Sequence, residues 1–263
     1  HRIAEPVEGF STPTWNVPPR LFATQLTGLL DLDWKPVPLR EALDFHQQGK
    51  SLSRKTFVVT FDDGYENNLT EALPILELLG VPATIFLATA YLDSDQPFPS
   101  DDWQSAGDPG VPRATWKPLT TEQCHELTAS GLIELAAHTH THADFRGRPD
   151  EFIADLCLCR ASLLQHFGIE QPTFAFPYGT KRDGFAGGAL AEAGASPSAA
   201  AAMLGRVVAR LAASQAALLV LAEPRSLWQR LRPATGDALG HYVSLHLDLR
   251  REEWFKAGPD VRG

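Results

Sequence analysis

The fold of this chain is decided by residues 55–65, which read Lys-Thr-Phe-Val-Val-Thr-Phe-Asp-Asp-Gly-Tyr. Residues Phe57–Phe61 are all apolar or β-branched, which is the pattern of a fully buried strand. Asp62, Asp63 and Gly64 follow at its carboxyl end, where parallel sheets and barrels collect ligands and catalytic groups. The alternative is a strand followed by an ordinary Asp-Gly turn. The residues further along the chain decide between these two interpretations.

Composition indicates a globular protein. The chain has 263 residues, of which 44% are hydrophobic and 21% charged, and this suits a sizeable core in one or two domains. A net charge of -9 without any basic cluster argues against nucleic acid as a partner. Cys124, Cys157 and Cys159 are predicted to be buried free thiols, because Cys157 and Cys159 point in different directions from one helix.

The termini and the hydropathy say little about location. No run of about 18 apolar residues is available to span a bilayer, and no signal peptide begins the chain. The first residue is His1 rather than Met, so we expect the true N-terminus to lie upstream. The compartment is therefore left open.

Helical and strand patterns alternate along the first two thirds of the chain. Helices are predicted from Pro18 or Pro19 to Leu30, over 39–48, 68–79 with a kink at Pro74, 120–130 behind a Thr120/Gln123 capping box, and 149–167. Strands are predicted over 57–61, 81–88, 132–136 and 173–176. A strand-helix-strand order implies parallel pairing through right-handed crossovers. The sequence therefore predicts a parallel α/β sheet or barrel with polar loops at one rim.

The strand over 132–136 leads into His138-Thr139-His140-Thr141-His142. His138 and His142 have the i, i+4 spacing that chelates a metal from a helical turn or a tight loop, and the preceding strand favours the loop. A carboxylate and two imidazoles are a common ligand set for a divalent transition metal with open positions for water and substrate. The alternative is a polar surface loop that is merely rich in His and Thr.

Two adjacent aspartates allow a division of labour at such a site. Adjacent side chains at a strand end point to different sides, so one carboxylate can bind the metal while its neighbour stays free as a general base. Water on the metal and a free carboxylate together suffice to hydrolyse an amide or an ester.

A long irregular stretch, residues 91–118, carries Trp103 and Trp116 and is placed to form the wall of a binding site. Trp103 either stacks on a sugar ring or pins this loop to the protein. Beyond Gly184 the sequence is dominated by Ala, Gly and Ser as far as residue 222, and the pattern fixes no element there.

Three motifs carry a resemblance to a known family. Thr60-Phe61-Asp62-Asp63-Gly64, His138-Thr139-His140-Thr141-His142 and Phe174-Ala175-Phe176-Pro177-Tyr178-Gly179, in that order, resemble the first three motifs of the polysaccharide deacetylases of carbohydrate esterase family 4, the NodB-homology fold. Each motif is modest alone, but three in order are highly specific. The resemblance implies a deformed (β/α) barrel with about seven parallel strands that removes acetyl groups from N-acetylated sugars.

The resemblance also implies roles for individual residues. Asp62 is expected to be the general base, and Asp63, His138 and His142 are expected to bind Zn²⁺ or a similar ion, which leaves His140 as the weaker ligand. The remaining expectations concern the surroundings of the metal. The Tyr178 backbone N–H would stabilise the tetrahedral oxyanion, Pro177 and Tyr178 would shape the substrate groove, and Thr139 would brace the histidine loop.

This sequence departs from the family in two places. Ala175 stands where many members have an Arg that pairs with the catalytic Asp, and the Phe-Ala-Phe-Pro-Tyr-Gly form resembles an exopolysaccharide-type branch that lacks this Arg. The late motif that supplies a histidine general acid has no clean match. His246, in Ser244-Leu245-His246-Leu247, is the best candidate, with His241 behind it.

We therefore predict one catalytic domain over residues 1–263, including the Ala-rich segment 184–222 and a C-terminal extension 223–263 to which no role is assigned. The predicted function is metal-dependent removal of N-acetyl groups from a polysaccharide that contains N-acetylglucosamine. One alternative is a metal-dependent amidohydrolase of a non-sugar amide. The other is a catalytically impaired carbohydrate-binding homologue.

Overall fold

The computed structural model describes residues 1–10, 15–48, 52, 55–99, 110–145, 148–177 and 206–207. Its helices are α1 (Pro19–Asp31), α2 (Leu39–Gln47), η1 (Asn68–Ala72, π-helical), α3 (Leu73–Leu79), η2 (Thr89–Tyr91), η3 (Arg113–Thr115), α4 (Thr121–Ala129) and α5 (Pro149–Phe167). Its strands are β1 (Arg2–Ile3), β2 (Asn16–Val17), β3 (Lys35–Pro36), β4 (Thr56–Phe57), β5 (Val59–Asp63), β6 (Ala83–Leu87), β7 (Ile133–Ala137), β8 (Thr173–Phe174) and β9 (Arg206–Val207).

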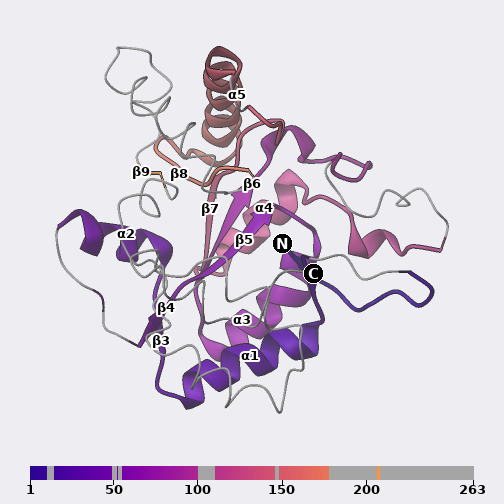
Figure 1. Cartoon of the computed structure of the whole chain (residues 1–263), viewed down its shortest axis with the longest axis vertical. Coiled ribbons are helices and arrows are strands. Elements are labelled where there is room, and N and C mark those ends of the chain that lie inside the picture. The colour runs from indigo at the N-terminus through magenta and orange to yellow at the C-terminus, as the bar shows by residue number, and fades with distance from the viewer. Residues whose placement is uncertain are drawn as a thin grey trace, which may run out of the picture.

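The centre of the fold is a parallel sheet in the order β5-β6-β7-β8-β9. Helices alternate with its strands, as the sequence predicts, and Figure 1 shows β5, β6 and β7 running side by side through the middle. The register pairs Asp63 with Leu87, and Leu87 with Ala137. The carboxyl ends of β5 and β7 therefore lie at the same edge of the sheet, so that Asp63 and His138 emerge close to each other.

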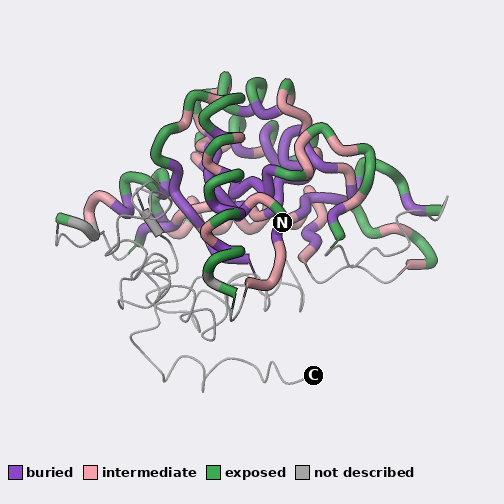
Figure 2. The backbone as a smooth tube through the Cα atoms, turned by 90° about the horizontal axis from the view of Figure 1, so that it is seen from above, coloured by how far each residue is buried: buried purple, intermediate pink, exposed green. Residues whose placement is uncertain are grey.

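Helices cover both faces of this sheet. On one face, α1, α3, α4 and α5 pack against the alternate strand residues Phe61, Ile85, Leu87 and Leu135. On the other face, Leu39 and Leu43 of α2 pack against Phe86 and Ala136. Figure 2 shows the buried backbone running through the interior, while the outward sides of the helices are exposed. The described residues hold no helix that is long and apolar enough to cross a membrane.

The predicted strand Phe57–Phe61 is wrong as a single, fully buried element. It is divided at Val58 into β4 and β5, because β3 ends opposite Phe57 whereas β6 begins opposite Val59. Val59 and Thr60 are half-buried rather than buried. The strand also continues to Asp63, so both aspartates belong to its end. Similarly, β8 ends at Phe174, two residues earlier than predicted.

The helix predicted over 68–79 has two parts. Pro74 has no N–H for the carbonyl of Thr70, and the preceding turn widens into η1, where the N–H of Leu73 bonds to the carbonyl of Asn68. The helix then ends at Gly80, whose φ of 63° is left-handed, as predicted. The proline therefore changes the width of the helix as well as its continuity.

Of the remaining local predictions, one is confirmed and another is partly wrong. The capping box is confirmed, since Thr120 and Gln123 each accept the other's backbone N–H. Cys124 and Cys159 are buried free thiols, but Cys157 is exposed, so its predicted burial is wrong. It lies on the solvent side of α5, whereas Cys159 lies on the core side. Of the Ala-rich segment 184–222, only residues 206–207 are described, and they pair with β8.

Candidate metal site

Asp63 is aimed into the site by an unusual backbone. Its φ is 73°, and that of Gly64 is 94°. A Cβ on Gly64 would lie 2.6 Å from Leu87 Cδ2, so the position requires glycine on both conformational and steric grounds. The carbonyl of Asp63 accepts the N–H of Ala88, and that of Gly64 accepts the N–H of Leu119. The strand end is thus fixed from two neighbouring segments.

The histidine loop follows β7 and has the tight, non-helical form that the sequence favours. Thr139 and His142 have positive φ values of 68° and 55°. The fully buried Thr139 hydroxyl accepts the N–H of His142 at 3.0 Å, which closes the loop on itself. The N–H of His138 donates to the carbonyl of Leu87, which ties the start of the loop to β6.

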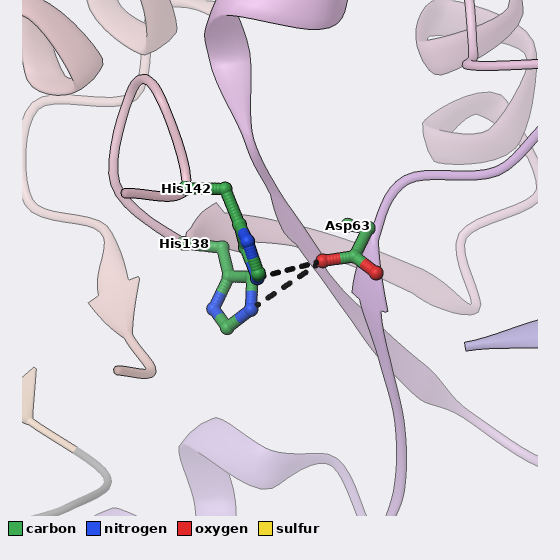
Figure 3. Close-up of side chains that lie close together, drawn as sticks. All are labelled: Asp63, His138 and His142. Atoms are coloured by element: carbon green, nitrogen blue, oxygen red, sulfur yellow. Dashed lines mark ion pairs between the residues drawn. The ribbon is translucent and has the colours of Figure 1, made fainter. Parts of the chain in front are cut away.

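Asp63, His138 and His142 point toward one another from these two strand ends (Figure 3). Asp63 Oδ1 lies 3.6 Å from His138 Nε2 and 3.2 Å from His142 Nε2. One ligand atom from each residue falls within 4.8 Å of the other two. The ligand atoms of a tetrahedral zinc ion with bonds of about 2.0–2.2 Å lie about 3.4 Å apart. Both distances from Asp63 Oδ1 to the histidine nitrogens are close to this value.

The chemistry of these atoms fits a cation. Asp63 Oδ1 and His138 Nε2 are buried and, within the described part of the chain, have no hydrogen-bond partner. A buried polar atom without a partner is costly, so these two atoms, which face each other, are suited to share a cation. His138 Nδ1 lies 3.0 Å from the carbonyl oxygen of Ala175, which directs its proton there and leaves Nε2 free to bind.

The electrostatics favour the binding forms of these groups. Burial lowers the pKa of His142 to about 4, against the opposing attraction of Asp63, so its ring is neutral at pH 7. Burial alone would raise the pKa of Asp63, but His1, followed by His142 and His138, holds that pKa below its usual range. A neutral imidazole and an ionised carboxylate are the forms that coordinate metals.

A third imidazole, which the sequence analysis missed, lies beside this cluster. His1 Nδ1 is 2.8 Å from Asp63 Oδ2, and His1 Nε2 is 3.6 Å from Asp62 Oδ2. Burial would lower the pKa of His1, but the Asp63 and Asp62 carboxylates outweigh it and raise the pKa to about 9. The ring also stacks on Trp15, with centroids 5.2 Å apart. No motif or spacing in the sequence links His1 to this site.

The other predicted site residues are placed as follows. Asp62 lies next to Asp63 with its side chain 29% exposed. His140 is outside the ligand cluster, since its Nδ1 bonds to the Thr89 hydroxyl at 2.9 Å. Pro177 is buried, three residues after β8 ends. Trp103, Tyr178 and His246 lie outside the described residues.

Fold and site together define a parallel α/β protein with a candidate Asp-His-His metal centre at the carboxyl edge of its sheet. The sequence pattern of the family described as "Polysaccharide deacetylase" matches residues 49–195, more than half of the chain. The chain belongs to this family. The match contains all three residues of the candidate centre.

Relatives and solved structures agree with this assignment. The chain is 31% identical over 150 residues to the poly-β-1,6-N-acetyl-D-glucosamine N-deacetylase of Escherichia coli K12, covering 56% of this chain and 21% of that protein. It is 26% identical over 171 residues to the Staphylococcus aureus MRSA252 enzyme of the same name, covering 62% and 53%. The chain thus spans from a fifth to about half of these relatives.

The structure of IcaB from Ammonifex degensii superposes with a TM-score of 0.54 at 25% identity, covering 68% of this chain and 76% of that one. The Streptococcus pyogenes deacetylase PplD gives a TM-score of 0.55 at 21% identity, covering 72% and 76%, and this likeness concerns the fold alone. The fold is that of these deacetylases, a deformed (β/α) barrel, of which the described residues form five parallel strands in the central sheet.

Proposed function

We propose that this protein is a metal-dependent N-deacetylase of a polysaccharide built from N-acetylglucosamine, with β-1,6-linked chains as the first substrate to test. The observation that carries the proposal is the cluster of Asp63, His138 and His142 within the family match. Among the described residues, Asp63 Oδ1 and His138 Nε2 of this cluster have no hydrogen-bond partner. The substrate class comes from the names of the relatives.

Asp63, His138 and His142 would hold the ion, with Zn²⁺ as the expected metal. A divalent ion in such a site supplies Lewis-acid chemistry, because it makes water more acidic and polarises a carbonyl oxygen. Fixed donors that face the developing oxyanion add to this stabilisation. In this chain the Tyr178 backbone N–H is proposed for that role, beside the groove that Pro177 and Tyr178 would shape.

Asp62 is suited to act as the general base. It is partly exposed, unlike Asp63, and lies one residue away at the same strand end, where a water molecule and a substrate can reach it. Asp62 would take a proton from water as the water oxygen attacks the acetamide carbonyl carbon. The carbon–nitrogen bond then breaks, which gives acetate and a free amine on the sugar.

The departing amine needs a proton, and we propose His1 as its donor. Its ring lies between Asp62 and Asp63, close to the ligand cluster, and its side chain is 23% exposed. General acid catalysis requires a group within hydrogen-bond reach of the leaving atom. His1 therefore joins His246, the candidate from the sequence, as a proposed acid, and the two can be separated by substitution.

The test is acetate release from β-1,6-linked N-acetylglucosamine oligomers by the full chain, measured with and without a chelator. We expect release that a chelator abolishes and added Zn²⁺ restores. Release from a small non-sugar amide, and none from the oligomers, would support the amidohydrolase instead. Oligomer binding without any chelator-sensitive release would support the carbohydrate-binding homologue.

A further inference from the structure

The two candidate histidine ligands come from a loop whose backbone needs external support. A helix would fix the i, i+4 spacing of His138 and His142 through its own hydrogen bonds, but the intervening residues are not helical. Thr139 and His142 are both in the left-handed region, which non-glycine residues rarely occupy. Such conformations persist only where the surroundings hold them.

The carbonyl groups of the loop are held by the segment that follows β6. Ala90 donates its N–H to the carbonyl of His140 at 2.9 Å, and Thr89 donates to that of Thr139 at 3.4 Å. The Tyr91 hydroxyl donates to the carbonyl of Thr141 at 2.9 Å. These contacts fix the carbonyl side of the loop. The N–H groups of His140 and Thr141 need other acceptors.

One side chain, Asp155 of α5, accepts from the donors on the other side. The N–H of His140 lies 2.5 Å from Asp155 Oδ1, and the N–H of Thr141 lies 3.0 Å from Oδ2. The Thr141 hydroxyl also donates to Oδ2, at 2.5 Å. Within the described part of the chain, the hydrogen bonds of the Asp155 carboxylate all run to this loop.

The position of the Asp155 carboxylate is fixed by its place in α5. Asp155 is only 5% exposed and lies on the core side of the helix, among Phe152, Leu156 and Cys159. A carboxylate on the apolar side of a helix is unusual, because burying it costs free energy unless donors satisfy it. Here the three donors of the loop do so, and the packed helix in turn fixes the carboxylate.

We propose that Asp155 is a positioning residue for the metal centre, which holds the histidine loop in the conformation that brings His138 and His142 to Asp63. The inference rests on the proposed function, since it assigns a role toward the same metal. Among the described residues, the Asp155 carboxylate bonds to the backbone of the loop and to the Thr141 hydroxyl rather than to the side chains of the proposed ligands. Loss of outer contacts of this kind typically weakens metal affinity by about 10–100-fold.

The test compares zinc affinity in the full chain by calorimetric titration of ZnCl₂ into metal-free protein. Asp155→Asn keeps the volume but presents an amide N–H to the N–H donors, so we expect its zinc dissociation constant to rise about tenfold or more. The visible spectrum of the Co²⁺-loaded variant should also change. The matched control is Asp150→Asn, the same substitution at an exposed position in the first turn of α5.

Thermal unfolding separates positioning from simple loss of stability. If Asp155 only stabilises the fold, the Asp155→Asn chain will have a lower melting temperature but, while folded, will bind zinc as tightly as the wild type. That result would overturn this inference and leave the proposed function standing. If Asp155→Asn does not fold, Thr141→Val provides the test, because it removes one of the three bonds by changing an exposed residue. Weaker zinc binding by this variant would support the inference, and unchanged zinc binding would overturn it. A wild-type chain that binds no zinc would overturn the proposed function and this inference together.

Discussion

His1 Nδ1 lies 2.8 Å from Asp63 Oδ2, although 62 residues separate them along the chain. Two asparagines at the start of η1 hold residues 1–3 in place. Asn67 Oδ1 accepts the N–H of Ile3, and Asn68 Nδ2 donates to the carbonyl of His1. The residues that follow the acidic motif therefore place the imidazole beside that motif.

The two adjacent aspartates should respond differently to substitution. Asp63→Asn should lose zinc, as should His138→Ala, because each removes a proposed ligand. Asp62→Asn should keep zinc but lower kcat by about 10²–10⁴-fold, the usual contribution of a general base. Metal content of the purified variants and acetate release check this pair. An active Asp62→Asn chain would show that Asp62 is not the base.

The two candidate acids can be separated in the same assay. His1→Gln should lower kcat by about 10²–10⁴-fold with zinc still bound, since His1 is proposed to donate a proton and not to coordinate. His246→Gln is the matched substitution. If only the His246 variant loses activity, the acid predicted from the family's late motif is correct and the role proposed for His1 is wrong.

Gly64→Ala should destabilise the fold more than the same change at Gly168. Both positions have positive φ, but an added Cβ at Gly168 meets nothing within 4 Å, whereas at Gly64 it meets Leu87 Cδ2 at 2.6 Å. Leu87 is fully buried, so it has little room to move. The free energy of unfolding in urea should fall by about 1–3 kcal/mol more for Gly64→Ala, as overpacking typically costs. Equal losses of unfolding free energy in the two variants would mean that the side chain of Leu87 moves aside at little cost.

The three cysteines should differ in reactivity toward a thiol reagent at pH 8. Burial raises the pKa of both Cys124 and Cys159 to about 12, so almost no reactive thiolate forms there at that pH. Cys157 is exposed on α5. We expect one thiol to react quickly in the folded chain and three to react in denaturant. Loss of the fast phase in Cys157→Ser would confirm its origin, and its persistence would contradict the burial pattern.

Local sequence patterns predicted the elements but not how distant segments meet. The capping residues Thr120 and Gln123 and the helix over 149–167 are encoded within a few positions, and both are confirmed. The break at Val58 depends on where two partner strands end, which no local pattern contains. The structure brings together the three predicted ligands Asp63, His138 and His142, while their binding of a metal stays a prediction.

The residues that surround the ligands were harder to find for the same reason. His1 reaches the site through the pairing of β1 with β2 and through its own contact with η1. Asp155 could have been noticed in the sequence, because it is a carboxylate on the apolar side of the predicted helix, beside Phe152 and Leu156. The sequence did not predict which residues it bonds to. Tyr178, Trp103 and His246 lie outside the described residues. The roles proposed for Tyr178 and His246 depend on the resemblance to the family, and the sugar-stacking role of Trp103 depends on its place in a long irregular stretch.

The π-helical turn η1 has a consequence for how this chain tolerates changes in length. Each residue of an α-helix advances the chain by about 100° around the axis, so removing one residue from 69–72 to restore an ordinary α-helix would rotate Asn67 and Asn68 away from β1. Their bonds to Ile3 and His1 would then be lost. A single-residue deletion in this helix would thus detach His1 from the site without altering any residue that lies in it, which agrees with the frequent location of π-helical turns next to functional sites.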